Sequence, residues 1–113
     1  MSADHLIHTP MDVTNEIARK GIIGVLLPTT LFYYLGRYAN TREIIRRGVP
    51  VALGTDLSAA NISESMQMMM MTIASLQMKM TPAEVFTAAT INAAYAVEKQ
   101  GEVGSIEEVG RLI

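Results

Sequence analysis

The 113-residue sequence contains no cysteine, and it has no excess of charge of either sign. The lack of cysteine excludes disulfides, a thiolate nucleophile and a zinc–cysteine site. Nine Lys and Arg residues stand against eleven Asp and Glu, which gives a formal net charge of −2. Because nucleic acids and anionic membranes attract concentrated positive charge, the composition gives no reason to expect either as a partner.

Long hydrophobic runs are also missing, since each apolar stretch is interrupted well short of the roughly 18 residues that a membrane span requires. The first five residues carry no basic stretch of the kind that begins a secretory signal. We therefore expect a cytoplasmic protein. Hydrophobic residues nevertheless make up 50% of the chain, which indicates one folded domain, or a piece of one, rather than a disordered chain.

Strand-like and helix-like patterns alternate three times along the sequence. The strand-like runs are residues 2–7, 22–27 and 49–54, and the helical patterns cover residues 10–20 and 40–47 and a long helix that Ser63 would cap. Alternation of this kind is typical of parallel strands joined by right-handed crossovers, so the expected fold class is α/β.

Local signals predict where several elements begin and end. Thr9 is expected to cap the first helix, with Pro10 at its first position. Thr81 and Glu84 have capping-box spacing, and the helix that they begin is expected to run to about Val97 without an intervening strand. The aromatic stretch 31–36 is expected to form a loop.

Two sets of apolar residues recur at helical spacing, and we expect both to be buried. The first set is Met66, Met69, Met70, Ile73 and Leu76, and the second is Val85, Phe86, Ala89, Ala93 and Ala96. Methionine can also line a promiscuous binding groove, but helical spacing inside a βα unit favours core packing.

Asp56 is the first candidate for a functional residue. It follows the third strand-like run, and in α/β folds ligands and chemistry gather at the carboxyl ends of strands. The alternative is that Asp56 only caps a turn before the next helix. His5 lies in the first strand-like run. Without further information, it could equally be a hydrogen-bonded core histidine with no functional role.

Five stretches carry a resemblance to known proteins: SADHL (2–6), VLLPTTLFY (25–33), ALGTD (52–56), MTPAE (80–84) and AATINAAYA (88–96). In this order and spacing they resemble the imidazolonepropionases of the metal-dependent amidohydrolase superfamily. The resemblance implies a partial TIM barrel, (β/α)8. Residues 1–100 would supply three successive βα units, barrel strands six to eight, plus an extra C-terminal helix. Residues 101–113 would begin the return to a small β-sandwich domain.

The resemblance also implies a site and a reaction. Asp56 would bind a divalent metal, zinc or iron, and help to deprotonate the attacking water. His5 would polarise the substrate carbonyl or handle a proton. The substrate would be a small cyclic amide, and the reaction would convert 4-imidazolone-5-propanoate to N-formimino-glutamate in histidine degradation. His8 has no matched role.

Two departures from the family pattern limit what the resemblance implies. The family's His-x-His pair and a further metal-binding histidine have no counterpart here, so we expect no complete metal site in this chain and no activity from it alone. The Asn-Pro-Gly that follows the family's aspartate is replaced by residues 57–61, in which Ser58 and Asn61 are the candidate substrate-binding donors. Another cyclic amide or amidine therefore stays open as the substrate.

A different class of function is a non-catalytic α/β module that self-associates. A three-stranded parallel sheet has two unpaired edges and apolar helix faces, which favour pairing between copies. We therefore expect a homo-oligomer. A small open-sheet ligand-binding domain is disfavoured, because no Gly-rich phosphate loop follows any of the expected strands.

Overall fold

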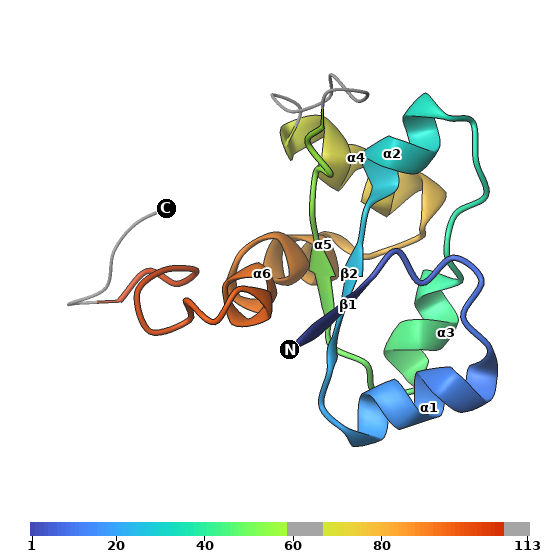
Figure 1. Cartoon of the computed structure of the whole chain (residues 1–113). Coiled ribbons are helices and arrows are strands. Elements are labelled where there is room, and N and C mark those ends of the chain that lie inside the picture. Colours follow the sequence, from blue (N-terminus) through green and yellow to red (C-terminus); the bar gives the residue numbers. More distant parts are fainter. Residues whose placement is uncertain (59–66, 108–113) are drawn as a thin grey trace.

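The computed structural model describes residues 1–58 and 67–107 (Figure 1). Within them β1 (Ser2–Asp4), β2 (Ile23–Leu26) and β3 (Val51–Leu53) form a parallel sheet in the order β1-β2-β3. The helices are α1 (Met11–Arg19), α2 (Pro28–Tyr33), α3 (Thr41–Arg46), α4 (Gln67–Gln77), α5 (Pro82–Ala89) and α6 (Ile91–Ala96). The α/β class and the parallel pairing expected from the alternating pattern are confirmed.

The register of the sheet brings the carboxyl ends of the strands to one edge. Gly24 pairs with Ala3 on one side and with Val51 on the other. A Cβ atom on Gly24 would lie 2.8 Å from a methyl of Leu6 and 3.2 Å from one of Val49, so the central strand passes close to its neighbours there. In Figure 1, α2 and α4 lie near the carboxyl ends of the strands, whereas α1 and α3 lie near the amino ends.

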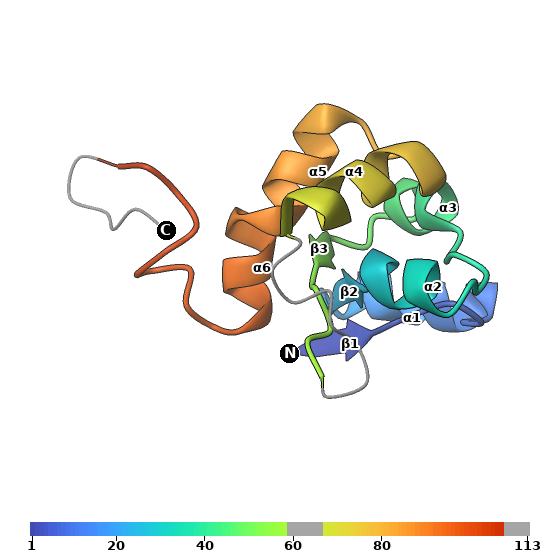
Figure 2. The ribbon, with the colours of Figure 1, turned by 90° about the horizontal axis from the view of Figure 1, so that it is seen from above.

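The hydrophobic core lies between the sheet and the helices that cover it. Its buried members include Leu26, Ile44, Val51, Leu53, Met70, Ala74, Met78, Met80, Val85 and Ala88. Figure 2 shows α5 and α6 beside β3, and contacts join α5 to β3 and α6 to both β2 and β3. No helix among the described residues combines the length and the hydrophobicity needed to cross a membrane.

Burial of the helical apolar sets was predicted correctly only in part. Met70 and Ile73 are buried, but Leu76 is 71% exposed and Phe86 is 62% exposed, so their expected burial is wrong. Both side chains lie on helix faces that the other described elements leave exposed to solvent. Ser63 and Met66 lie outside the described residues.

Residues 31–36 were expected to form a loop, and this is wrong for the first half of that stretch, which belongs to α2. Pro28 begins α2 at a position where a missing N–H costs nothing, and Leu31 is buried beneath it. The three aromatic side chains of the stretch are exposed, so the helix has no clear apolar stripe that could have predicted it.

The helix expected to continue to Val97 breaks at Thr90, which separates α5 from α6. Thr90 has φ −118° and ψ −94°, outside the helical region, and its hydroxyl donates to the carbonyl of Phe86 at 2.7 Å. The break turns α6 so that Asn92 reaches β3, where its side-chain amide donates to the carbonyl of Val51 at 2.8 Å. The break therefore coincides with a long-range contact between α6 and β3.

The N-terminal segment differs from expectation at two positions. The first strand ends at Asp4 rather than at residue 7, because His5 and Leu6 adopt φ values of +69° and +53° that a strand does not accept. At α1, Pro10 occupies the cap position and no side chain caps the helix, so the expected role of Thr9 is wrong.

Candidate functional site

Asp56 lies just beyond β3, at the carboxyl edge of the sheet. Its carboxylate Oδ2 accepts a hydrogen bond of 2.6 Å from the hydroxyl of Thr30. The preceding carbonyl, of Thr55, accepts one of 2.8 Å from the hydroxyl of Thr29. Both threonines lie in the first turn of α2, which directly follows β2, so the end of the neighbouring strand holds the segment that carries Asp56.

The backbone of Asp56 has φ +55°, in the left-handed region. Aspartate enters this region more readily than most residues, but it still does so at a cost that surrounding contacts must offset. The side chain is half-buried. The site therefore holds a carboxylate in an uncommon backbone conformation at the end of the sheet where ligands bind in α/β folds.

His5 lies at the same edge of the sheet, immediately after β1. Its backbone N–H donates to the carbonyl of Val25 at 2.9 Å, which continues the strand pairing by one residue, and its side chain is exposed. Because β2 lies between β1 and β3, and paired strands lie about 4.8 Å apart, the backbones near His5 and Asp56 are roughly 10 Å apart. The two residues thus face one end of the sheet from its two outer strands.

The remaining candidates lie farther from this arrangement or outside the structure. Ser58 is exposed two residues beyond Asp56, and His8 is exposed before α1. Asn61 falls outside the described residues. Thr29 and Thr30 were given no role from the sequence. One signal could have identified them. Two adjacent hydroxyl residues follow one predicted strand directly, and the next predicted strand is followed by an acid.

The donor types at this edge fit part of a metal site. A carboxylate and an imidazole are both ligands that zinc accepts, and a hydroxyl that donates to a ligating carboxylate is a usual supporting contact. Within residues 1–58 and 67–107, no group of three or more His, Cys, Asp or Glu side chains lies close enough to hold a metal ion. Since protein zinc sites use at least three such ligands, Asp56 and His5 would need ligands from other residues to hold zinc.

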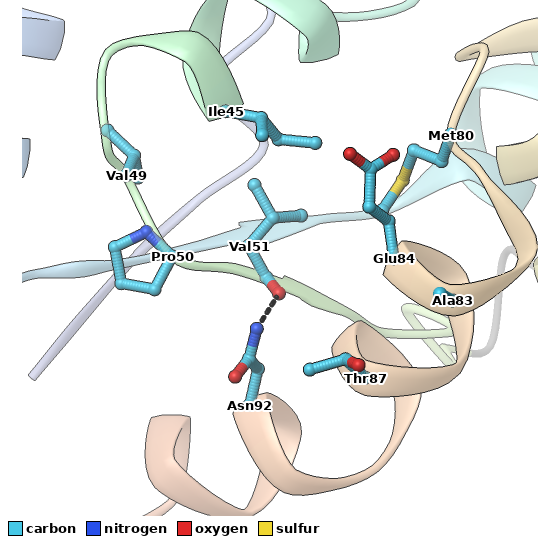
Figure 3. A pocket seen from close by; sticks show the side chains of 9 residues that line it. All are labelled: Ile45, Val49, Pro50, Val51, Met80, Ala83, Glu84, Thr87 and Asn92. Atoms are coloured by element: carbon cyan, nitrogen blue, oxygen red, sulfur yellow. Dashed lines mark hydrogen bonds between the residues drawn. The ribbon is translucent and has the colours of Figure 1, made fainter.

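A cavity of about 320 Å³ lies at the opposite, amino-terminal end of β3 (Figure 3). It is lined by Ile45, Val49, Pro50, Val51, Met80, Ala83, Glu84, Thr87 and Asn92. Two of its polar side chains are engaged in the fold: Asn92 donates to Val51, and the Glu84 carboxylate accepts from the Thr81 backbone N–H and from Arg42. We therefore place the candidate site at Asp56 and not in this cavity.

Comparison with known sequences gives matches over nearly the whole chain. The profile of the amidohydrolase family matches residues 3–110. Curated imidazolonepropionases from Alkaliphilus metalliredigens and Geobacillus thermodenitrificans are 44% and 43% identical over 108 and 107 residues. Each alignment covers 95% of this chain but only 26% and 25% of the relative, so the chain spans about a quarter of the length of these relatives.

Solved structures show the same fold. An adenosine deaminase from Xanthomonas campestris with bound zinc superposes with a TM-score of 0.83 at 24% identity, over 94% of this chain and 26% of that one. Atrazine chlorohydrolase TrzN from Arthrobacter aurescens TC1, complexed with zinc, gives a TM-score of 0.80 at 22% identity over 96% and 26%. Because the amidohydrolase family profile matches residues 3–110, nearly the whole sequence, the chain belongs to the amidohydrolase family.

Proposed function

We propose that the chain is a portion of an imidazolonepropionase-like hydrolase, supplying strands six to eight of its TIM barrel. The hydrolase would cleave a C–N bond of a small cyclic amide. The observation that carries the proposal is the alignment with imidazolonepropionases, at 43–44% identity over 107 to 108 residues. The three parallel strands, with Asp56 and His5 at their shared carboxyl edge, support it.

The chemistry of the two side chains accounts for their roles in this reaction. A bound divalent metal, zinc or iron, would supply Lewis acidity and lower the pKa of a water molecule toward neutrality. Asp56 would provide one ligand and accept the proton of the attacking water. The imidazole of His5 would donate a hydrogen bond to the ring carbonyl as negative charge develops on its oxygen. Attack of the water oxygen on the ring carbonyl carbon would form a C–O bond, the ring C–N bond would break, and the leaving nitrogen would take the proton that Asp56 accepted.

A graft tests this proposal without requiring that the 113-residue chain be active alone. Residues 1–107 would replace the aligned segment of the Geobacillus thermodenitrificans imidazolonepropionase, and the purified graft would be assayed for metal content and for opening of 4-imidazolone-5-propanoate. We expect about one metal per protomer and ring opening. Asp56→Asn should reduce both, whereas His5→Ala should reduce activity and spare the metal, because it removes the hydrogen-bond donor to the ring carbonyl and not an assigned ligand.

His8→Ala is the matched control, because His8 is an exposed histidine of the same segment with no assigned role. A graft that folds and binds metal but keeps its activity in both Asp56→Asn and His5→Ala would refute the assigned roles. A drop in His8→Ala as large as that in His5→Ala would show that the effect is not specific to His5.

The identity of the substrate rests on the segment after Asp56, in which we propose Ser58 and Asn61 as donors to the acidic end of the substrate. A metal-loaded graft that leaves imidazolonepropanoate intact but opens another cyclic amide or amidine would shift the proposal to that substrate. In an active graft, Ser58→Ala is expected to raise KM and change kcat little, because the contact would serve binding before and during the reaction equally.

A further inference from the structure

Three consecutive hydrogen bonds join the end of β2 to the end of β3. The backbone N–H of Gly54 donates to the carbonyl of Leu26 at 3.0 Å, and this continues the sheet beyond β3. The hydroxyl of Thr29 then reaches the carbonyl of Thr55, and the hydroxyl of Thr30 reaches the carboxylate of Asp56. On the β3 side the contacts fall on three successive residues, whereas on the β2 side they pass from residue 26 to residues 29 and 30. Side-chain hydrogen bonds from the start of α2 therefore follow the last backbone pairing of the two strands.

The donors of this pairing stand on a rigid base. Thr29 is 2% exposed, and Pro28 and Leu31 on either side of the pair are buried. Threonine is branched at Cβ, which restricts its side chain to few rotamers, and Pro28 fixes the start of α2. The backbone that carries both hydroxyls is therefore fixed, and burial further restricts the side chain of Thr29.

The acceptor needs such support. Asp56 has a positive φ, and an aspartate side chain has several staggered rotamers, so contacts to the carboxylate select among them. The 2.6 Å separation between the Thr30 hydroxyl and Oδ2 falls in the range of hydrogen bonds to ionised acceptors, which are shorter and stronger than neutral ones. The contact therefore restrains the carboxylate itself and not only the backbone.

We propose that Thr30 is a positioning residue for Asp56: its hydroxyl fixes the carboxylate in one rotamer before any ligand binds. Thr29 fixes the backbone on which Asp56 stands. The proposal rests on the proposed function in one respect only, namely that Asp56 serves as a metal ligand and proton acceptor. A carboxylate held in advance gives a metal site higher affinity, because no rotamer freedom is lost on binding.

The rotamer of Asp56 can be measured directly in the 113-residue chain by NMR, from the scalar couplings between its α and β protons. We expect one rotamer in the parent chain and in Thr30→Ser, which keeps the hydroxyl. Thr30→Val, which keeps the side-chain volume but removes the donor, should give averaged couplings. Thr30→Ala gives the same test if Thr30→Val fails to fold.

Thr72→Val is the matched control, because the exposed hydroxyl of Thr72 donates to the carbonyl of Met68 within its own helix, α4, and not to Asp56. It should leave the Asp56 couplings unchanged. A single Asp56 rotamer that persists in both Thr30→Val and Thr30→Ala would overturn the proposal, whatever the activity of the complete enzyme.

Metal affinity in the graft is the second measurement. Loss of a hydrogen bond to a metal ligand usually lowers affinity 10- to 100-fold, and we expect a loss in this range for Thr30→Val with recovery in Thr30→Ser. Unchanged affinity in Thr30→Val would refute the positioning role toward the metal. If the graft fails to open the imidazolone ring, the proposed substrate is refuted. The Asp56 rotamer and the metal affinity would still test the role of Thr30.

Discussion

At the scale of single residues, the segment that carries Asp56 depends on buried hydroxyl contacts. Thr29 is almost fully buried, and its hydroxyl donates to the carbonyl of Thr55. We predict that Thr29→Val lowers the free energy of unfolding by about 1–2 kcal/mol, because the nearly isosteric change removes a hydrogen bond in a buried site. Urea denaturation of the 113-residue chain measures the change. Thr72→Val, which loses a hydroxyl on an exposed helix face, should stay close to the parent, and equal losses in the two variants would contradict the prediction.

A second pair of residues distinguishes backbone strain from close packing. Gly21 and Gly104 both have positive φ, so alanine is strained at either position. A Cβ on Gly21 would meet nothing within 4 Å, whereas one on Gly104 would lie 2.8 Å from the Cβ of Ala94 and 3.1 Å from the Cα of Ile91.

We therefore predict that Gly21→Ala costs about 1 kcal/mol in free energy of unfolding and that Gly104→Ala costs roughly 1–3 kcal/mol more. Chemical denaturation of both variants would measure the difference. Equal costs would mean that the segment after α6 does not pack against that helix as the structure describes.

At the scale of elements, the start of α5 combines a capping box with an ion pair. The Thr81 hydroxyl accepts from the Glu84 N–H, and the Glu84 carboxylate accepts from the Thr81 N–H at 2.8 Å and pairs with Arg42 of α3 at 2.5 Å. The hydrogen bond from the Thr81 backbone lowers the pKa of Glu84 most. Burial opposes this shift, and Arg42 adds to the lowering.

A carboxyl whose pKa is lower in the folded than in the unfolded chain stabilises the fold above its unfolded pKa, and this stabilisation is lost as the pH falls through its folded pKa. We predict that Glu84→Gln lowers the free energy of unfolding by roughly 0.5–1 kcal/mol at neutral pH and by less once the pH is well below 4.5, the ordinary pKa of glutamate. Urea denaturation at both pH values tests this. Glu102→Gln is the matched control, because it breaks only an exposed ion pair with Lys99, and its change in free energy of unfolding at neutral pH should be smaller. If the loss of stability in Glu84→Gln did not vary with pH, the argument would be refuted.

The elements also show how far sequence patterns reach. The β2 run, α3 and the Thr81–Glu84 capping box were predictable, because each depends on residues within one or two turns. The break at Thr90 was not, since it depends on Asn92 reaching the Val51 carbonyl from 41 positions along the chain. The contact between Thr30 and Asp56, 26 positions apart, is of the same kind. The position of the acid followed from the strand pattern, but the hydroxyl that holds it could be recognised only once the strands were paired.

At the scale of the whole molecule, one outer surface is strongly apolar. A cavity of about 570 Å³ lies between α5, α6 and the segment 103–106, and Phe86, Val97 and Ile106, which line it, are each more than half exposed. In Figures 1 and 2 the segment after α6 extends away from the sheet, so this surface is not closed over by the described part of the chain. Contiguous apolar surface of this kind favours association.

We predict that the 113-residue chain self-associates reversibly through this surface, with an apparent mass that rises between micromolar and millimolar concentration in light scattering. The double variant Phe86→Lys/Val97→Lys should stay monomeric over a wider range, because it places two charges where association would remove them from water. Tyr34→Lys is the matched control, since Tyr34 is about as exposed as Phe86 but lies at the end of α2, outside the cavity. A chain that stays monomeric over the whole concentration range would contradict the prediction. If Tyr34→Lys reduced association as much as the double variant does, the contact would not be specific to this surface. Association lost only in the double variant would confirm that the copies meet through this surface.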